Sequence, residues 1–158
     1  MSIQKEFEAV IEKYGHDIIY VRTDKRFRCT CFSERSGGPG KSKCKKCFGT
    51  GYHTTTKVVK VRRQISSLPE SLVRTRNTYE TGSFAAKAFV YYFTKSAKPK
   101  TGDIILEVNW KNNIPISIKD SYLISIADGK QGDQGEIEFY QVYCKYQSEG
   151  SDERNALT

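Results

Sequence analysis

The first fifteen residues place apolar side chains at the spacing of one helical face. Those side chains are Ile3, Phe7, Val10, Ile11 and Tyr14. Residues three and four positions apart lie on the same side of an α-helix, so the spacing predicts one amphipathic helix. Ser2 is a candidate N-cap, and Gly15 is a residue type at which helices commonly end. We therefore expect a single helix over residues 3–14.

After the helix, the chain consists of runs rich in Val, Ile, Thr and aromatic residues, which are typical of β-strands. The runs cover residues 18–21, 54–65, 89–93, 103–108, 114–126 and 136–146. The Gly- and Asp-rich stretch 128–135 predicts a hairpin loop. In the last run we expect Ile137, Phe139 and Tyr143 to face inward. Short strands joined by turns predict a mainly β protein, a small antiparallel β-barrel or sandwich with one N-terminal helix.

The pattern divides the chain into four parts. Residues 1–25 hold the helix and the first strand of the body, and residues 26–53 form a hairpin inserted between two strands. Residues 54–146 form the rest of the β body, in which the polar stretch 66–81 predicts a long loop. Residues 147–158 are polar and acidic, so we expect a flexible C-terminal tail.

Length and charge narrow the class of protein. A chain of 158 residues suits one domain, which at this size buries roughly 70% of its unfolded surface. Hydrophobic residues make up 37%, and no apolar run approaches the length of a bilayer span, so we expect a soluble protein with no membrane partner. The net charge of +8 is uneven, because residues 22–63 hold 13 Lys or Arg against 2 acidic residues. The basic character belongs to the inserted hairpin and its flanks.

Four of the five cysteines lie in this basic segment, at a spacing typical of zinc sites. Cys29-x-Cys31 is followed, after twelve residues, by Cys44-x-x-Cys47. Zinc favours four soft ligands in a tetrahedron, and two cysteine pairs on one hairpin are a common way to supply them. The candidate ligands are Cys29, Cys31, Cys44 and Cys47, and the expected cofactor is structural zinc.

The residues around the two pairs favour the same interpretation. On an extended strand, the side chains of Cys29 and Cys31 would point to one face. Gly49 can take positive φ, which a tight metal knuckle requires. Four thiolates around a divalent cation carry a net negative charge that nearby lysines can offset. Those lysines are Lys41, Lys43, Lys45 and Lys46, which are also candidate contacts for a partner or DNA.

Other uses of these cysteines are weaker hypotheses. A disulfide framework suits a secreted chain, but the cysteine count is odd and a bond within the first pair would close a strained ring. A redox dithiol at the second pair would need a helix N-terminus, whereas the local sequence indicates a turn. Four protein ligands leave no open position for catalysis at the metal. His53 is an alternative ligand, and Cys144 is expected to be a small buried apolar residue.

Two parts of the chain resemble neck proteins of tailed bacteriophages. Cysteine blocks of such proteins look like the run Arg28-Cys29-Thr30-Cys31 together with Cys44-Lys45-Lys46-Cys47-Phe48-Gly49-Thr50-Gly51-Tyr52. The run 100–108, with the isoleucine-rich strand and residues 135–140 after it, is similar to the β-barrel of head-closure proteins, also called stoppers. Chaperone zinc domains share the cysteine pattern but carry four copies of it, and this chain has one.

The resemblance implies a structural virion protein that connects the head to the tail. Such proteins form rings of identical subunits, commonly hexameric, between portal or adaptor proteins and tail proteins, and the channel retains packaged DNA. The expected location is the neck of the virion, assembled in the host cytoplasm. The loop 66–81, with Arg74 and Arg76, is a candidate contact with a neighbouring ring or with DNA, and a solvated surface loop is the alternative.

A zinc-dependent nucleic-acid-binding module is the second hypothesis, because basic residues alternate with aromatic ones beside the hairpin. Its phosphate contacts would come from Arg22, Lys25, Arg26, Arg28, Arg62 and Arg63. Against it, no base-reading helix follows the zinc pairs. With only His16 and His53, no nucleophile elbow and no phosphate loop, the sequence offers no catalytic set, so we expect neither an enzyme nor a small-molecule substrate. A capping role at the helix-to-strand junction suffices for His16.

Overall fold

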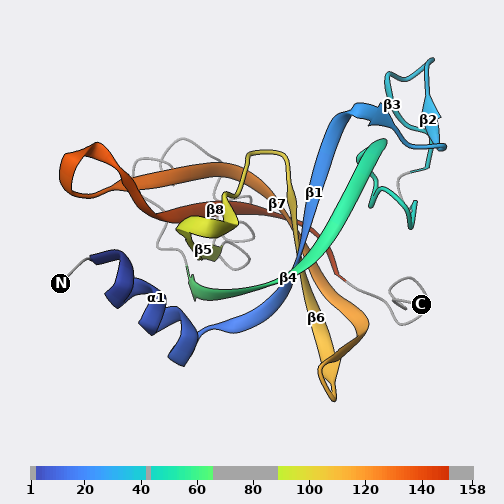
Figure 1. The fold of residues 1–158 in the computed structure, drawn as a ribbon. Helices are drawn as coiled ribbons and strands as arrows, with labels where there is room; N and C mark the ends of the chain where they lie inside the picture. The colour runs from blue at the N-terminus through green and yellow to red at the C-terminus, as the bar shows by residue number, and fades with distance from the viewer. Residues whose placement is uncertain (1–2, 42–43, 66–88, 150–158) are drawn as a thin grey trace, which may run out of the picture.

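The computed structural model describes residues 3–41, 44–65 and 89–149, and it consists mainly of antiparallel strands (Figure 1). Helix α1 (Ile3–Tyr14) opens the chain and ends, as predicted, where the amide of Gly15 donates to the carbonyl of Ile11. The long strands are β1 (His16–Arg28), β4 (Tyr52–Ile65), β5 (Phe89–Thr94), β6 (Ile104–Lys111), β7 (Ile114–Gln131) and β8 (Ile137–Glu149). The predicted fold class, mainly β with one N-terminal helix, is confirmed. Within the described ranges, no helix is long and apolar enough to cross a membrane.

The six long strands close on themselves. Their order is β1-β4-β5-β8-β7-β6, and β6 pairs back with β1, where Tyr20 lies opposite Ile105. Every neighbouring pair is antiparallel. Of the two predicted architectures, the structure is therefore a closed barrel rather than a sandwich. Closure removes free strand edges from the paired part of the sheet, so no other chain can add a strand there.

Alternate side chains from all six strands fill the interior of the barrel. The buried members are Ile18, Tyr20, Val61, Tyr91, Phe93, Ile105, Tyr122, Ile124, Val142 and Cys144, with Ala97 at one end. Cys144 is thus a small buried core residue, as predicted. Because successive strand residues point to opposite faces, the intervening positions of each strand face outward.

Helix α1 packs against the outer face of β4, β5 and β8. The ring of Phe7 stacks on Phe139 of β8 with centroids 4.3 Å apart and meets Tyr92 of β5 edge to face at 6.1 Å. The prediction that Phe139 faces the core was wrong, and Ile137 and Tyr143 share its alternation, because the even-numbered residues of β8 fill the interior. Both faces of β8 are apolar here, so alternation alone does not say which face is inside.

A second apolar cluster, here called the outer cluster, covers the outer face of the other three strands, β7, β6 and β1. Its buried members are Ile19, Val21, Ile104, Leu106 and Val108, and Phe48, Trp110, Ile118 and Leu123 pack against it. These positions alternate with the interior ones along β1 and β6. Phe48 comes from the cysteine hairpin, so an apolar contact anchors that hairpin to the barrel wall.

Two buried carboxylates lie among the strands. Glu107 accepts a 2.7 Å hydrogen bond from the hydroxyl of Tyr91, and Nε2 of His16 lies 2.9 Å from the same oxygen. Asp103 accepts a hydrogen bond from the hydroxyl of Tyr20. His16, for which the sequence suggested only a capping role, thus joins the helix-to-strand junction to a carboxylate inside the barrel.

The observed boundaries of the hairpin segments differ from the predicted ones. β1 continues to Arg28 and β4 begins at Tyr52, so the inserted hairpin covers residues 29–51 rather than 26–53. The loop predicted at 128–135 is shorter than expected, because β7 continues to Gln131 and only a tight turn precedes β8. In both places a strand continues into residues that were predicted to belong to the hairpin or the loop.

The predicted C-terminal tail also begins later than expected. β8 runs to Glu149, which lies opposite Asp120 of β7, so residues 147–149 belong to the sheet. Ladder hydrogen bonds to a long partner strand outweigh the polar composition of this segment. The remainder of the predicted tail, 150–158, and the predicted loop 66–81 lie outside the described residues.

Candidate metal centre

Strands β1 and β4 extend beyond the barrel and carry the cysteine hairpin at their end (Figure 1). β1 pairs with β6 only over Ile19–Val21, whereas its pairing with β4 continues to Arg28 opposite Tyr52. We call the extended ribbon, residues 22–28 and 52–55, the arm. The register shifts within it, so that residues 25–27 of β1 bulge outward without partners on β4.

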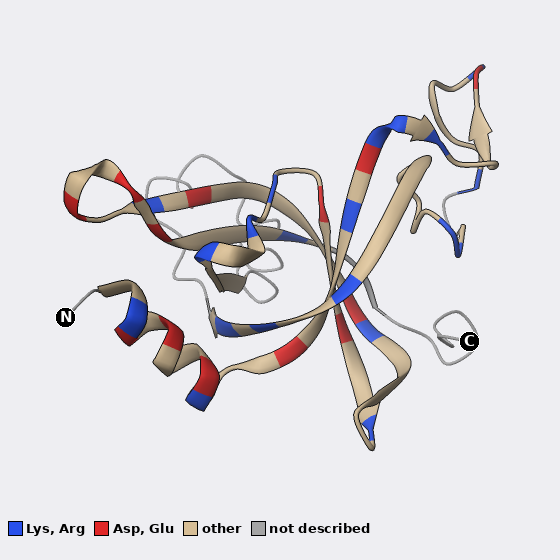
Figure 2. Cartoon of the chain, in the orientation of Figure 1, with Lys and Arg blue, Asp and Glu red and all other residues tan. Residues whose placement is uncertain are grey.

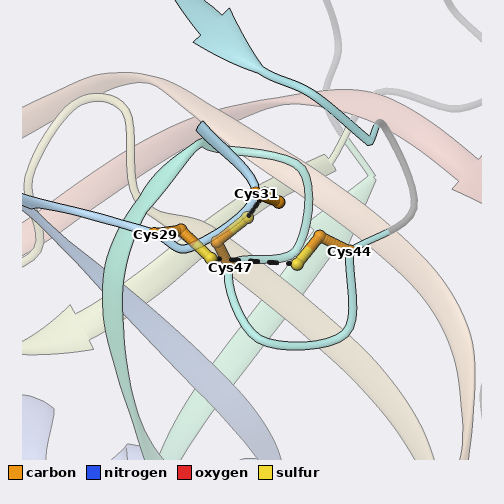
Figure 3. Close-up of side chains that lie close together, drawn as sticks. All are labelled: Cys29, Cys31, Cys44 and Cys47. Atoms are coloured by element: carbon orange, nitrogen blue, oxygen red, sulfur yellow. Dashed lines mark hydrogen bonds between the residues drawn. The ribbon is translucent and has the colours of Figure 1, made fainter. Parts of the chain in front are cut away.

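The hairpin brings four cysteine sulfurs together (Figure 3). The Sγ atoms of Cys29, Cys31, Cys44 and Cys47 all lie within 4.8 Å of one another. The sulfurs of Cys31 and Cys47 are 3.5 Å apart, and those of Cys29 and Cys44 are 3.9 Å apart. Tetrahedral ligands with metal–sulfur bonds of about 2.3 Å would lie about 3.8 Å from one another, so the spacing suits a single ion. The four predicted ligands therefore form a group that could bind a metal ion.

The second cysteine pair sits in a tight knuckle, residues 44–51. The amide of Gly51 donates to the sulfur of the buried Cys47 at 3.4 Å, and the amide of Phe48 donates to the carbonyl of Cys44 at 2.9 Å. Gly49 has a φ of +82°, as predicted, and Gly51 has a φ of +83°. These two glycines let the chain reverse and turn an amide toward a sulfur.

Phe48 is a part of the knuckle that the sequence did not reveal. Its φ is +53°, an uncommon conformation for a non-glycine residue, and its ring packs on the outer cluster of the barrel. Strain of this kind persists where surrounding contacts hold the residue in place. A phenylalanine directly after Cys47, in an otherwise polar hairpin, is the signal that could have indicated such an anchor.

The first cysteine pair lies in a turn, and the prediction of an extended segment was wrong. The amide of Phe32 donates to the carbonyl of Cys29 at 2.9 Å, which folds the chain back between the two cysteines. The reason is geometric, because residues two apart on a strand are separated by about 6.6 Å, whereas sulfurs on one tetrahedral ion are about 3.8 Å apart. Only a bent backbone aims Cys29 and Cys31 at one point.

Contacts at the base and side of the hairpin hold its two halves together. The amide of Cys29 donates to the carbonyl of Gly51 at 2.9 Å, which closes the base. The short strands β2 (Phe32–Ser33) and β3 (Gly38–Pro39) pair with each other beside the sulfurs. The amide of Gly40 donates to the carbonyl of Cys31 at 2.7 Å. With so little apolar surface, a bound metal is expected to be the main source of stability here.

The four thiols differ in how easily they ionise. The backbone amides of Cys47 and Lys46 lower the pKa of Cys44 to about 6, and the amide of Cys31 lowers the pKa of Cys29. Desolvation and the neighbouring sulfur of Cys47 raise the pKa of Cys31 to about 12. A cation among the sulfurs would favour the thiolate form of all four, because it offsets both desolvation and mutual repulsion.

Positive charge gathers on the arm and the hairpin (Figure 2). Lys41, Lys45 and Lys46 are exposed around the cysteine group, where their charges can offset those of the thiolates. Lys43 lies outside the described residues. The predicted partner contacts Arg74 and Arg76 also lie outside them.

His53, the alternative ligand, lies on the arm rather than among the sulfurs. Its ring meets that of Phe27 edge to face, with centroids 6.5 Å apart, and it does not belong to the cysteine group. Phe27 comes from the bulge of β1 and is mostly exposed. The bulge therefore presents an aromatic ring and two cations, Lys25 and Arg26, to solvent.

The fold and the site together define a small closed β-barrel that carries a four-cysteine candidate metal centre on a projecting arm. No family model matches this chain, and no curated protein matches it either. Its function is therefore argued from the barrel, the arm and the cysteine group.

Proposed function

We propose that the cysteine group binds zinc and that the ion is structural. Four thiolates in a tetrahedron are typical of zinc and of iron–sulfur proteins, and a closed set of four protein ligands suits a structural zinc site. The sulfur spacing of 3.5–3.9 Å within the two closest pairs supports one small ion. The basic hairpin further supports a tetrathiolate centre, because its lysines compensate the excess negative charge.

The metal is tested on the purified full-length chain. Elemental analysis is expected to give one zinc per chain, and replacement by cobalt should give the absorption of a tetrahedral thiolate complex. Cys47→Ser should lose the ion, whereas Cys144→Ser, which changes a core cysteine remote from the hairpin, should keep it. Iron, a brown colour or no bound metal in the wild-type protein would contradict the assignment.

We propose further that the chain is a structural subunit of the neck of a tailed bacteriophage. In this role it joins head to tail in a ring, and the arm with its zinc hairpin docks on an adjoining protein. The observation that carries the proposal is the combination of a closed barrel with long ribbons that project from it in different directions (Figure 1). A rigid centre with projecting ribbons suits a subunit that must touch several neighbours at once.

Several features of the described residues support docking over catalysis. The cysteine ligands hold a protrusion together, and the histidines serve in a 2.9 Å polar contact with Glu107 and in an aromatic contact on the arm. Exposed apolar side chains occur on the arm and on the β6–β7 hairpin, namely Phe27, Ile114 and Ile116. Such side chains on several ribbons are typical of protein–protein contact sites.

Electron microscopy tests the neck assignment. The purified chain is mixed with portal, adaptor and tail proteins encoded beside it, and negative-stain images are expected to show an added ring at the exit of the portal. Lys45→Glu with Lys46→Glu, which reverses charge on the hairpin, should weaken docking, whereas Lys98→Glu on the barrel should not. Complexes without added density would contradict the proposal.

One observation favours the second candidate function, a nucleic-acid-binding module. A cleft of about 670 Å³ lies at the base of the arm and is lined by Arg22, Arg26, Phe27, His53 and Lys100, among others. A cleft with cations and an exposed aromatic ring suits a nucleic-acid strand, in which phosphates alternate with bases that can stack.

Internal pairing weakens this second candidate. Arg26 makes a two-pronged ion pair with Asp24 at 2.9 and 3.0 Å, which lowers the pKa of that carboxyl to about 2. Arg22 donates to the carbonyls of Ala97 and Lys98 at 3.0 and 2.7 Å. Two of the three cations in the cleft are thus already engaged within the described residues. Fluorescence anisotropy with single-stranded DNA distinguishes the neck subunit from the nucleic-acid-binding module. Binding that weakens with salt and is lost in Lys100→Glu would favour the module.

A further inference from the structure

The knuckle folds back along the outer face of the arm toward the barrel. The hydroxyl of Thr54 on β4 donates to the carbonyl of Lys46 at 2.8 Å, and Thr54 lies opposite Thr23 of β1. Val21, two positions before Thr23, points to the same outer face because side chains alternate along a strand. Val21 is also the β1 member of the outer cluster nearest the arm. The knuckle therefore lies beside one end of the outer cluster.

The ring of Phe48 covers that end of the cluster. There Val21 of β1 lies opposite Ile104 of β6, and both side chains are 0% exposed. Phe48 is half-buried and packs against the cluster. The other three apolar side chains that pack on the cluster belong to the barrel strands β6 and β7. Among the described residues, Phe48 is thus the one apolar cover that comes from outside the barrel.

The position of this ring depends on the knuckle that surrounds the second cysteine pair. Phe48 has a φ of +53°, which a non-glycine residue keeps only where neighbouring contacts enforce it. The amide of Phe48 donates to the carbonyl of Cys44 at 2.9 Å, and the amide of Thr50 donates to the carbonyl of Cys47 at 3.0 Å. Both acceptors belong to cysteines of the candidate metal centre, so an ion that fixes these cysteines also fixes the ring.

We propose that the bound ion controls whether the outer cluster is covered. With the ion in place, the knuckle holds Phe48 on the barrel wall. When the ion leaves, the knuckle opens, the backbone strain at Phe48 is released and the apolar end of the outer cluster becomes accessible. The barrel stays folded, because its interior core does not involve the hairpin. This inference rests on the proposed zinc site and adds a metal-dependent apolar surface to it.

Metal affinity gives the first test, because the coupling is reciprocal. If the ion favours the covered form, the cover favours binding of the ion. Phe48→Ala removes the cover without touching a sulfur, and the full chain should bind zinc about tenfold more weakly. Phe48→Gly loses the same ring but relieves the strained φ, so its loss should be smaller. Phe27→Ala is the matched control, since this aromatic ring of the arm is 60% exposed and lies outside the outer cluster.

Methyl resonances of the full chain give the second test. The methyl groups of Val21 and Ile104 should shift when a chelator removes the ion, and the shifted positions should match those of zinc-loaded Phe48→Ala. The methyl groups of Val61 and Ile105, inside the barrel, should stay in place and so verify that the barrel is folded. A dye that fluoresces on apolar surfaces should bind more to both samples than to the zinc-loaded wild type. Phe48→Leu replaces Phe48→Ala if that variant does not load with zinc.

Elemental analysis of the same samples separates this inference from the zinc proposal. If the chelator removes the ion and the methyl groups of Val21 and Ile104 do not move, the inference is overturned and the zinc site stands. Wild-type zinc affinity in Phe48→Ala would overturn it as well. A purified wild-type chain without metal would contradict the zinc proposal itself, and the inference with it, before any chelator is added.

Discussion

The hydroxyl of Tyr91 donates a 2.7 Å hydrogen bond to Oε1 of Glu107 inside the barrel. Nε2 of His16 lies 2.9 Å from the same oxygen, and Nη1 of Arg63 lies 3.6 Å from it. A buried carboxylate is costly unless it is paired and hydrogen-bonded, and Glu107 has both kinds of partner. The group joins β1, β4, β5 and β6, which are consecutive around one part of the closed sheet.

The first prediction concerns acid stability. Burial raises the pKa of Glu107, but hydrogen bonds from His16 and Tyr91 outweigh it, so the pKa lies below the ordinary value of 4.5. A carboxyl with a lowered pKa in the folded state binds its proton more tightly when unfolded. Its stabilising contribution is therefore complete well above pH 4.5 and is lost as the pH falls through the folded-state pKa. Urea unfolding at several pH values should show this loss.

Glu107→Gln isolates that contribution. The variant keeps an oxygen that can accept from Tyr91 but loses the charge, so we expect a loss of about 1–3 kcal/mol at neutral pH. Its stability should also fall less steeply below pH 4.5 than that of the wild type. Glu34→Gln is the control, since the Glu34 side chain is 87% exposed. An unchanged acid profile in Glu107→Gln would contradict the assignment.

A second prediction concerns removal of the metal. If the hairpin is held by an ion, as we propose, and the barrel by its own core, a chelator should expose residues 29–51 to proteases and leave the barrel intact. Mass spectrometry of limited-digestion products should place the first cuts within the hairpin, while near-ultraviolet circular dichroism of the barrel aromatics stays unchanged. If the chelator abolished the protease resistance of the hairpin and the near-ultraviolet signal of the barrel together, the hairpin and the barrel would unfold as one unit.

The knuckle gives a third prediction, at Gly51. Its φ is +83°, and a Cβ there would lie 3.0 Å from the nitrogen of Pro39. Gly51→Ala should therefore cost about 1–2 kcal/mol and weaken metal binding, because the strained turn positions the amide that donates to Cys47. Gly38→Ala, where an added Cβ meets nothing within 4 Å, should bind metal normally. Competition with a chromophoric chelator measures the metal affinity of the two variants. Equal affinities in Gly51→Ala and Gly38→Ala would contradict this prediction.

The helix, the strands and the four-cysteine group were predictable because each rests on local chemistry. Apolar spacing predicted α1, β-branched runs located the strands, and the cysteine spacing identified the four side chains that the fold brings together. Gly49 was expected to take positive φ, and it does. Each of these inferences needs only residues that are close in the sequence.

The remaining features depend on pairing between distant residues. The sequence pattern could not show which face of β8 points into the barrel. Phe139 is apolar on the outer face because it packs against helix α1, which lies more than a hundred positions earlier in the chain. The contact of His16 with Glu107 spans 91 positions, and its one local signal is a glutamate within an apolar strand. Barrel closure likewise depends on the pairing of β1 with β6, which no local pattern encodes.

The last prediction follows from the contact between α1 and β8. Phe7 and Phe139 stack at a centroid distance of 4.3 Å, and removing either ring should release the helix from the sheet. Phe139→Ala should cost about 2–3 kcal/mol, below the range for a fully buried ring because Phe139 is half-buried. Phe7→Ala should cost a similar amount, and the double variant should cost less than the sum, because both substitutions break one contact.

Hydrogen exchange shows where that stability is lost. Amides of α1 should exchange faster in Phe139→Ala, whereas the amides of β1 and β6, on the other half of the barrel, should stay protected. Tyr143→Ala is the control. It also removes an aromatic ring from β8, but the ring that stacks on Phe7 of the helix is that of Phe139. Additive losses in the double variant, or equal exchange in α1 with and without Phe139, would mean that the helix is held to the barrel by other contacts, such as that of the buried Ile11.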